Sequence, residues 1–416
     1  MRSVIQLRPC QKEVFSLMRT HSKMLTVAPT SAGKSIMMIA DAHERIKNNS
    51  ETTVVVVASK ILLVQQLSEE FQKFIPNASI VHLHSGDTEH KRFTNFLDLS
   101  YWCETTGGPK IIFTTYHSLY KIALAELNLD VVYLDECHNA VNPRFFDAVK
   151  ELSQTAKNFY SMTASPKFSQ VTSKPGNNDA EVFGSKIFSV RAPELIQDGS
   201  ILPPNASVME VKGIRNSKEG AAERDFYTLC DGILGDDSGD MNKVLVVAPN
   251  TKVIMEMFSM TSFLEEMTEN GYEVLHITSK YGAFIGKKKV TRVEFLKTLS
   301  AYGADSKKKF VVFHIGILTE GISVPGIQTC IFMRNQNMIS TVQTIGRCIR
   351  VHPEDTDRMK SGELTPGDFD NYQKPYGKVV IPVYSDRAGI ATARRVENVI
   401  NEIFVKGNYV ADIIKK

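Results

Sequence analysis

The sequence predicts an α/β protein with two tandem lobes, each built on a parallel β-sheet covered by helices. The chain has 416 residues, which suits two domains of roughly 200 residues better than one. Short apolar, β-rich runs alternate with longer amphipathic runs, as in parallel sheets whose strands are connected by helices. This alternating series occurs twice along the chain. We therefore expect two similar halves with a ligand cleft between them.

The first half of the chain begins with a series of short apolar runs that predict strands. Helical patterns at residues 34–47 and 62–74 fall between these runs. Residues 165–179 are rich in Ser, Pro, Gly and Asn, which predicts a loop. The expected strands are residues 24–28, 54–58, 80–84, 111–114, 131–135 and 159–163.

The composition changes at residues 201–205, where Leu-Pro-Pro-Asn precedes a polar, charged stretch. We therefore expect the first lobe to span residues 1–205 and the second lobe to span residues 206–416. Residues 353–378 contain many Pro, Gly and charged residues without a strong period, and this predicts an exposed insertion. In the second lobe, strands are expected at 244–248, 274–278, 310–314, 329–333 and 379–384, and helices at 253–269 and 290–302.

The composition is that of an ordinary globular protein. The formal net charge is only +3, so charge alone does not indicate a nucleic-acid-binding protein. Lysine runs at residues 287–289 and 307–309 are more typical of solvated loops than of a nucleic-acid surface. The six cysteines form no C-x-x-C pair, which argues against a zinc or redox site. The first residues lack the apolar core of a signal peptide, and no apolar run is long enough to span a membrane. These features predict a cytoplasmic protein.

A segment typical of phosphate-binding loops follows the first predicted strand and opens the first predicted helix. Ala28-Pro-Thr-Ser-Ala-Gly-Lys-Ser35 fits the loop pattern, except that Ala28 stands where the first glycine is usual. In such a loop, backbone N–H groups and the helix N-terminus face the phosphates, and Gly33 lets the backbone approach closely. Lys34 would reach the β- and γ-phosphates, and Ser35 would bind magnesium. The alternative is an ordinary strand–turn–helix connection. The residues predicted to bind ATP here are Pro29, Thr30, Ser31, Ala32, Gly33, Lys34 and Ser35.

A pair of acidic residues follows the predicted strand 131–135, in the sequence Leu134-Asp-Glu-Cys-His138. Asp135 can hold a magnesium ion, and Glu136 can orient or deprotonate an attacking water molecule. Ligands of open parallel sheets bind beyond the carboxyl ends of the strands, which is the edge that both motifs occupy. Alone, this pair could merely cap a helix; together with the phosphate loop, it indicates an ATP site.

The sequence Asp135-Glu136-Cys137-His138 resembles the DEAD/DEAH-box motif of superfamily 2 helicases, in its D-E-C-H variant. With this resemblance, other segments across nearly the whole chain are similar to the remaining family motifs, in family order. The likeness is greatest to UvsW-type branch-migration helicases of tailed bacteriophages. It implies two RecA-like lobes with ATP and magnesium between them, the first lobe being the helicase ATP-binding domain and the second the helicase C-terminal domain. Because the core begins almost at Met1, we expect no separate N-terminal substrate domain.

The resemblance also assigns residues to the adenine base and to the nucleic-acid strand. Gln11 lies in a segment similar to the adenine-reading Q motif, although Cys10 stands where an aromatic residue is common. Residues 161–165 resemble motif III, which couples the nucleotide site to the strand-binding groove. Residues 194–203 resemble the segment that closes lobe one in the branch containing XPB, UvsW and the restriction translocases. The residues expected to contact the strand are Ser59, Lys60, Thr114, Thr115, Asn250 and Thr319.

The strongest motif of the second lobe contains two arginines, Arg347 and Arg350. Gln343-Thr-Ile-Gly-Arg-Cys-Ile-Arg350 is similar to motif VI, and residues 315–325 are similar to motif V. The spacing of Arg347 and Arg350 would place both on one face of a helix, from which they would meet the γ-phosphate. Gln343 and Gly321 are further expected ATP contacts. The alternative is a surface helix with two solvated arginines.

The resemblance implies an ATP-dependent helicase or translocase on single-stranded, forked or branched DNA, with 3′-to-5′ polarity and a role in replication, recombination or repair. RNA is the less expected partner, and a viral source would place the protein in the host cytoplasm. Two alternatives stay open. One is a translocase that remodels protein–nucleic acid complexes, or an RNA helicase. The other is a catalytically silent nucleic-acid-binding scaffold, against which the intact Lys34, Asp135, Glu136, Arg347 and Arg350 argue.

Overall fold

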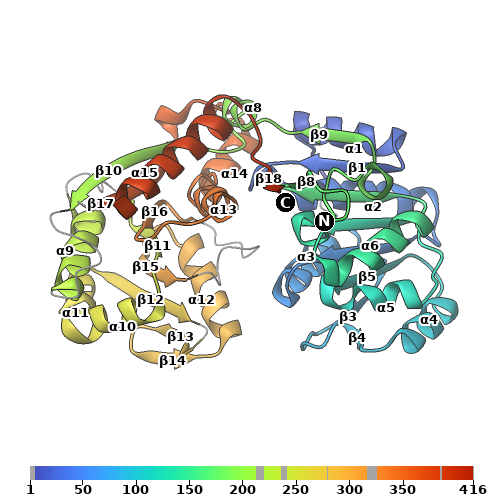
Figure 1. Cartoon of the computed structure of the whole chain (residues 1–416), viewed down its shortest axis with the longest axis horizontal. Helices are drawn as coiled ribbons and strands as arrows, with labels where there is room; N and C mark the ends of the chain where they lie inside the picture. Colours follow the sequence, from blue (N-terminus) through green and yellow to red (C-terminus); the bar gives the residue numbers. More distant parts are fainter. Residues whose placement is uncertain are drawn as a thin grey trace. The chain divides into compact units, whose positions relative to one another are not determined.

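The structure, a computed structural model, describes residues 5–211, 220–235, 241–278, 280–315, 326–384 and 387–415. It divides into two compact units, shown in Figure 1. Unit 1 consists of Met1–Val190 together with Tyr409–Lys416, and unit 2 consists of Arg191–Asn408. No helix in these ranges is both long and apolar enough to cross a membrane.

Unit 1 is built on a parallel sheet with the strand order β4-β3-β5-β2-β6-β7-β1-β9. The strands predicted at residues 131–135 and 159–163 have those bounds in the structure. The central strands are buried along their whole length, as expected when helices cover both faces of a sheet. The strands are β1 (Lys23–Val27), β2 (Thr53–Ala58), β3 (Ser79–Leu83), β4 (Lys91–Phe93), β5 (Lys110–Thr115), β6 (Val131–Asp135), β7 (Phe159–Thr163) and β9 (Lys186–Ser189).

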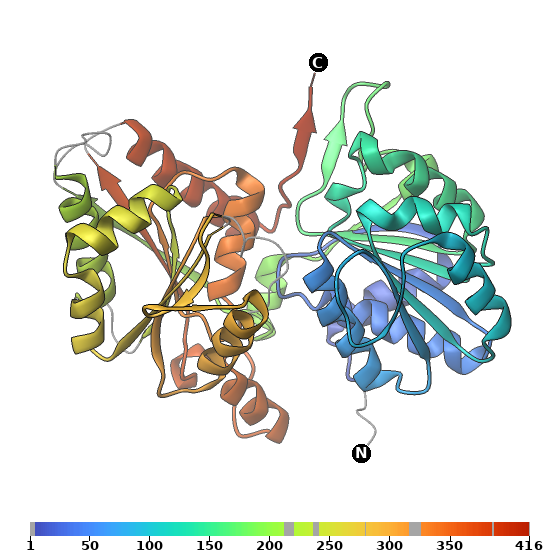
Figure 2. The ribbon, with the colours of Figure 1, turned by 90° about the horizontal axis from the view of Figure 1, so that it is seen from below.

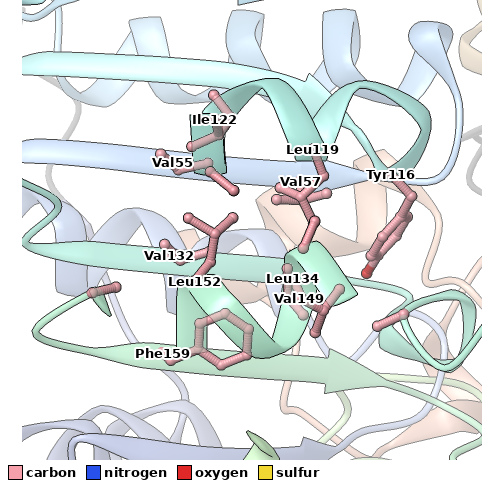
Figure 3. Close-up of a cluster of buried hydrophobic side chains, with 14 of the residues drawn as sticks. Val55, Val57, Tyr116, Leu119, Ile122, Val132, Leu134, Val149, Leu152 and Phe159 are labelled. Atoms are coloured by element: carbon pink, nitrogen blue, oxygen red, sulfur yellow. The ribbon is translucent and has the colours of Figure 1, made fainter. Parts of the chain in front are cut away.

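One face of this sheet forms a large apolar core with two helices, as Figure 3 shows. Val55, Val57 and Val132 point from the strands toward Leu119 of α5 and Val149 of α6. The neighbouring residues Val54 and Val56 are equally buried on the opposite face, which explains the continuous apolar runs in the sequence. The helices of unit 1 are α1 (Pro9–Thr20), α2 (Lys34–Asn48), α3 (Ile61–Phe74), α4 (Phe96–Thr105), α5 (Leu119–Leu124), α6 (Pro143–Thr155) and α7 (Ala180–Phe183).

A buried polar network attaches α2 to the opposite face of the sheet. Asp41, which is fully buried, accepts hydrogen bonds from Tyr133 Oη at 2.5 Å and Arg45 Nε at 2.7 Å. Arg45 Nη2 also donates to Tyr160 Oη at 2.9 Å. Burial raises the pKa of Tyr160 to about 12, so this hydroxyl keeps its proton at neutral pH. The network fixes the helix that begins at the phosphate loop.

Replacing Asp41 by alanine is expected to destabilise unit 1 by about 3–5 kcal/mol, because it leaves Arg45 and Tyr133 without their buried acceptor. Urea unfolding followed by tryptophan fluorescence measures this, since the only tryptophan of the chain, Trp102, lies in α4 of unit 1. Asp87→Ala is the control, because Asp87 is an exposed residue of unit 1 whose Oδ1 lies 3.6 Å from Arg92 Nη1. It should change stability by less than about 0.5 kcal/mol. Equal losses in the two variants would contradict the role of the network.

Unit 2 contains a mixed sheet with the strand order β10-β17-β16-β11-β15-β12-β13-β14. The strands β10, β17, β16, β11, β15 and β12 are parallel. β13 and β14 add an antiparallel hairpin at one edge of the sheet. Its strands are β10 (Pro204–Val211), β11 (Lys243–Val247), β12 (Tyr272–Thr278), β13 (Gly282–Ile285), β14 (Lys288–Val290), β15 (Lys309–His314), β16 (Thr329–Phe332) and β17 (Gly377–Tyr384). Its helices are α8 (Ala192–Gln197), α9 (Ala221–Leu234), α10 (Thr251–Met260), α11 (Phe263–Glu269), α12 (Arg292–Ala304), α13 (Met338–Cys348), α14 (Pro353–Ser361) and α15 (Arg387–Val399), followed by the π-helical segment η5 (Ile400–Val405).

One expectation for unit 2 is wrong, and a second holds only in part. The helix expected at residues 253–269 is divided into α10 and α11, because Thr261 Oγ1 donates to Met257 O at 2.6 Å and accepts from Phe263 N at 3.3 Å. Residues 353–378 are exposed over much of their length, as expected, but Asp355 is fully buried and Lys374 is 1% exposed. Hydrogen bonds inside unit 2, described below, accommodate these two buried charges.

The division between the units differs from the predicted boundary at residue 205. Residues 191–203 belong to unit 2, where Leu202 N donates to Ile349 O at 2.8 Å and β10 pairs with β17. The C-terminal residues return to unit 1, where β18 (Asp412–Ile414) pairs in parallel with β8 (Lys167–Ser169), as Figure 2 shows. The predicted loop 165–179 therefore contains a short strand. Unit 1 is formed from both ends of the chain.

Candidate functional site

The phosphate-loop segment connects β1 to α2 at the carboxyl edge of the unit 1 sheet. Ser31 has a φ of 76° and Gly33 a φ of 80°, so both adopt the left-handed conformation. Gln11 Nε2 donates to Ala32 O at 3.0 Å and holds the loop against α1. The φ angle of Gly33 favours glycine, and a Cβ atom there would lie 2.3 Å from Gln11 Nε2 and displace this amide from its hydrogen bond to Ala32. The loop thus presents the N-terminus of α2 as an anion-binding end.

The acidic pair lies where β6 ends. Asp135 is the last residue of the strand, and Glu136 follows it with φ 47° and ψ 53°, a left-handed conformation that is unfavourable for glutamate. Both residues are buried. Tyr116 Oη donates to Asp135 O at 2.8 Å, and Asn139 Nδ2 donates to Glu136 O at 3.0 Å. These contacts hold the backbone of the turn in place.

The structure brings the phosphate loop and the acidic pair together. Lys34 Nζ lies 3.2 Å from Glu136 Oε1, and both side chains are about nine-tenths buried. Burial would lower the pKa of Lys34, but the charges of Glu136 and Asp135 raise it above its ordinary value. Burial opposes ionisation of Glu136, but Lys34 and His138 hold its pKa well below the usual range. Burial and the nearby Glu136 charge raise the pKa of Asp135 to about 7.

The second oxygen of Glu136 contacts residues that were not predicted individually. Thr163 Oγ1, at the end of β7, donates to Glu136 Oε2 at 3.3 Å, and His138 Nδ1 lies 3.4 Å from the same oxygen. His138 Nδ1 and Thr163 Oγ1 are 3.0 Å apart. Both residues belong to segments singled out in the sequence, 135–138 and 161–165, but their types alone gave no individual signal. Thr163 links Glu136 to the segment that resembles motif III.

The donor atoms at this edge fit magnesium and a nucleotide phosphate. The Asp135 carboxylate and the Ser35 hydroxyl are oxygen donors of the kind that magnesium prefers. Within the described ranges, no group of three or more His, Cys, Asp or Glu side chains could hold a metal ion. Magnesium commonly takes one or two protein oxygens and completes its shell with phosphate oxygens and water, so this small donor set suits it. Thr30 Oγ1, beside the loop, is buried without a hydrogen-bond partner in the protein.

The strand-contact candidates of unit 1 lie just after β2 and at the end of β5, at the same carboxyl edge. Ser59 and Lys60 precede α3, and the buried Ser59 Oγ has no hydrogen-bond partner in the protein. Thr114 is fully buried and donates through Oγ1 to Leu83 O at 2.8 Å. Thr115 is 5% exposed. Thr114 therefore supports the edge from within, and contact of these residues with nucleic acid stays a prediction.

The unit 2 candidates lie on two elements. Asn250 follows β11 and caps α10, with Oδ1 accepting from Val253 N at 3.0 Å. Gln343 and Arg347 lie on α13 and are buried. Arg350 lies two residues beyond the end of α13, so the two arginines do not share one helical face as expected. Thr319 and Gly321, in the segment similar to motif V, are outside the described residues.

The backbone contacts of residues 349–350 explain why the helix stops before Arg350. Ile349 O accepts from Leu202 N at 2.8 Å, and Arg350 O accepts from Lys374 Nζ at 2.9 Å. These donors come from two other segments of unit 2 and satisfy the carbonyls that follow the helix. The chain therefore leaves the helical path between Cys348 and Arg350.

Each unit contains a segment that matches a family of known proteins. Residues 4–168 match the family described as "Type III restriction enzyme, res subunit", and residues 226–352 match the "Helicase conserved C-terminal domain". A relative from Sulfolobus islandicus filamentous virus (isolate Iceland/Hveragerdi), named "Putative helicase 22", is 22% identical over 355 residues, which is 78% of this chain. The chain spans 57% of that relative.

Solved structures show the same fold. The Type ISP restriction-modification enzyme LlaBIII bound to DNA matches with a TM-score of 0.70 and 14% identity over 98% of this chain. This chain corresponds to 31% of that enzyme. The DEAD-box helicase Mss116 bound to ssRNA and UDP-BeF matches with a TM-score of 0.61 and 15% identity, over 99% of this chain and 75% of Mss116. Each unit thus has a RecA-like α/β fold, as the sequence predicted.

Proposed function

We propose that the chain is an ATP-hydrolysing enzyme of helicase superfamily 2, which couples hydrolysis to movement along DNA. The observation that carries this proposal is the buried contact of Lys34 with Glu136, 3.2 Å apart at the carboxyl edge of unit 1. It joins the phosphate-binding lysine to the acidic residue that would activate water. Residues separated by about a hundred positions in sequence thus form one reaction site.

The geometry supports a change of partner for Lys34 when ATP binds, from Glu136 to the phosphates. The phosphate oxygens compete with Glu136 for the Lys34 ammonium, and release of that ammonium frees Glu136 Oε1 to accept a proton from water. Thr163 and His138 continue to hold the other carboxylate oxygen, so the side chain keeps its orientation. Magnesium, which Asp135 and Ser35 would hold, supplies charge neutralisation for the phosphates. The remaining ATP contacts proposed for unit 1 are Gln11 and the loop residues Pro29, Thr30, Ser31, Ala32 and Gly33.

We further propose that unit 2 supplies the arginines that act on the γ-phosphate. Arg347 is 3% exposed, in a helix whose register is fixed by packing, and the backbone of Arg350 is held by Lys374. Fixed positive charges stabilise the transition state of phosphoryl transfer without having to reorganise during the reaction. Alternation between ATP-bound and released states would change the affinity for the strand and thereby drive movement.

The proposed track is single-stranded, forked or branched DNA. The similarity of residues 4–168 to a restriction enzyme subunit supports DNA, and so does the similarity to LlaBIII, a DNA-bound enzyme. The likeness of the motifs to UvsW-type helicases supports branch migration and a 3′-to-5′ polarity, in replication, recombination or repair. The similarity to Mss116, bound to ssRNA, favours RNA as the second candidate. Forked DNA and RNA substrates with a labelled strand distinguish the two, and stimulated hydrolysis without strand release would indicate a remodelling translocase.

We expect single-stranded or branched DNA to increase the rate of ATP hydrolysis severalfold. DNA binding should weaken steeply as salt rises, because contacts to phosphates release counterions. A phosphate-release assay with and without DNA, together with DNA binding measured between about 50 and 200 mM salt, tests this expectation. Lys34→Ala is the control that should abolish hydrolysis in both conditions. Equal turnover with DNA, with RNA and without nucleic acid would contradict the proposal.

A further inference from the structure

The end of the arginine-bearing helix α13 is held by a buried lysine from a distant part of unit 2. Lys374 Nζ donates to Arg350 O at 2.9 Å and to Ile327 O at 2.6 Å. Lys374 is 1% exposed, so its ammonium group is enclosed and directed at these two carbonyls. Arg350 follows α13, and Ile327 lies just before β16. One side chain therefore joins two backbone segments that the sequence separates by 23 residues.

Burial of a lysine is unfavourable, which makes its position informative. Desolvation lowers the pKa of Lys374 to about 8, so folding opposes its charge. An apolar side chain of similar length would avoid this cost, but it could not donate to two carbonyls at once. Both hydrogen bonds that the ammonium donates go to backbone carbonyls, those of Arg350 and Ile327.

A second buried charge fixes the lysine itself. Asp355 is fully buried and accepts from Gln373 N at 3.1 Å and from Lys374 N at 3.4 Å. Arg358 Nη1 lies 3.5 Å from the same carboxylate. Asp355 therefore orients the backbone of residues 373–374 and leaves the lysine ammonium for the carbonyls. Residues 353–378 thus form a brace: the segment starts shortly after Arg350 and returns to the Arg350 carbonyl through the Lys374 side chain.

We propose that Lys374 is a positioning residue for ATP hydrolysis, which fixes the backbone from which the Arg350 side chain projects. The inference rests on the proposed function, in which Arg350 acts on the γ-phosphate. Lys374 itself does not contact the nucleotide in this proposal. A misplacement of about 1 Å in a catalytic group can cost about 10²-fold in rate. The brace should therefore affect the rate of the chemical step and leave ligand affinities unchanged.

Lys374→Met in the full-length chain tests this role. The variant keeps the length of the side chain but removes both donors. We expect kcat for ATP hydrolysis to fall by about 10- to 100-fold. The dissociation constants for ATP and for single-stranded DNA should stay within about twofold of the parent, because the phosphate loop and the groove residues are untouched. A role limited to folding would lower the active fraction without this separation of kcat from affinity, and titration of active sites with labelled ATP measures that fraction.

Lys243→Met is the matched control. Lys243 is another buried lysine of unit 2, 2% exposed, and its Nζ donates to Gly303 O at 2.7 Å. Burial lowers its pKa as well. The control removes the same buried ammonium from a carbonyl of α12 and not from Arg350. Its kcat should stay within about threefold of the parent. An equal loss of kcat in the two lysine variants would overturn the inference, and so would a parallel loss of ATP affinity in Lys374→Met.

Asp355→Asn keeps the test decisive if Lys374→Met does not fold. Its amide preserves the shape of the carboxylate but weakens the hold on the backbone of residues 373–374. A smaller loss of kcat, with unchanged affinities, supports the brace, and an unchanged kcat overturns it. Hydrolysis is also measured without DNA. A parent enzyme that hydrolyses ATP without any stimulation by nucleic acid would contradict the proposed function, while the comparison of kcat values still decides the role of Lys374.

Discussion

Alanine in place of Arg347 or Arg350 is expected to slow ATP hydrolysis by about 10³-fold, as for the loss of a transition-state arginine. DNA binding should stay largely intact, because the predicted strand contacts lie on other residues. ATP affinity should change little, because Lys34 and the N-terminus of α2 hold the phosphates. Single-turnover hydrolysis, together with equilibrium binding of a labelled ATP analogue, separates these effects.

Arg292→Ala is the matched control for the arginine variants. Arg292 is an exposed arginine at the start of α12, and its removal should change no measured quantity by more than about 0.5 kcal/mol. If Arg347→Ala and Arg350→Ala hydrolyse ATP within a few-fold of this control, the composite site must be abandoned. Two structural arginines would then be the better interpretation of motif VI.

The second large effect is expected for Glu136→Gln. The amide cannot take a proton from water, so hydrolysis should fall by about 10²- to 10⁴-fold. ATP should bind as tightly as in the parent or more tightly, because Lys34 loses the carboxylate 3.2 Å away and is free for the phosphates. Steady-state hydrolysis and ATP titration of the same preparation test both parts.

Glu126→Gln is a stringent control for this variant. Glu126 is an exposed glutamate after α5 that also adopts a left-handed conformation, with φ 48°. The control carries the same chemical change at a similar backbone geometry, away from the phosphate loop, and it should hydrolyse ATP at the parent rate. A Glu136→Gln variant with normal turnover would show that the acidic pair has been misassigned.

The sequence predicted the central strands best, for a physical reason. Strands such as β6 and β7 are covered on both faces, so their apolar runs are continuous and their bounds are clear. The short strands β4 and β14 lie at sheet edges, with β13 next to β14, and exposed or half-buried residues interrupt the apolar pattern there. Their pairing depends on neighbours that are distant in sequence, and local periodicity does not contain that information.

Some residues of the candidate site could likewise be predicted from the sequence, and others could not. Lys34, Asp135 and Glu136 belong to segments with fixed spacing, and the structure places them at one edge of the sheet, although their roles stay predictions. The contact of Thr163 with Glu136 depends on the order of β6, β7 and β1 in the sheet, which a single strand does not reveal. Lys374 lies in a stretch rich in Pro, Gly and charge, where a surface position is the normal expectation.

The return of residues 409–416 to unit 1 has a consequence for fragment design. A fragment that stops at residue 190 lacks β18, whose Asp412 N donates to Pro166 O at 2.9 Å, directly after the segment that resembles motif III. A fragment that stops at residue 205 lacks it as well and carries residues 191–203, which fold with the other unit. A fragment that contains all of unit 1 thus needs residues 409–416 as well, either fused ahead of residue 5 by circular permutation or added in trans as a peptide. Unit 1 is therefore a discontinuous domain, with unit 2 inserted between residues 190 and 409 of its sequence, and the pairing of β8 with β18 joins its two segments.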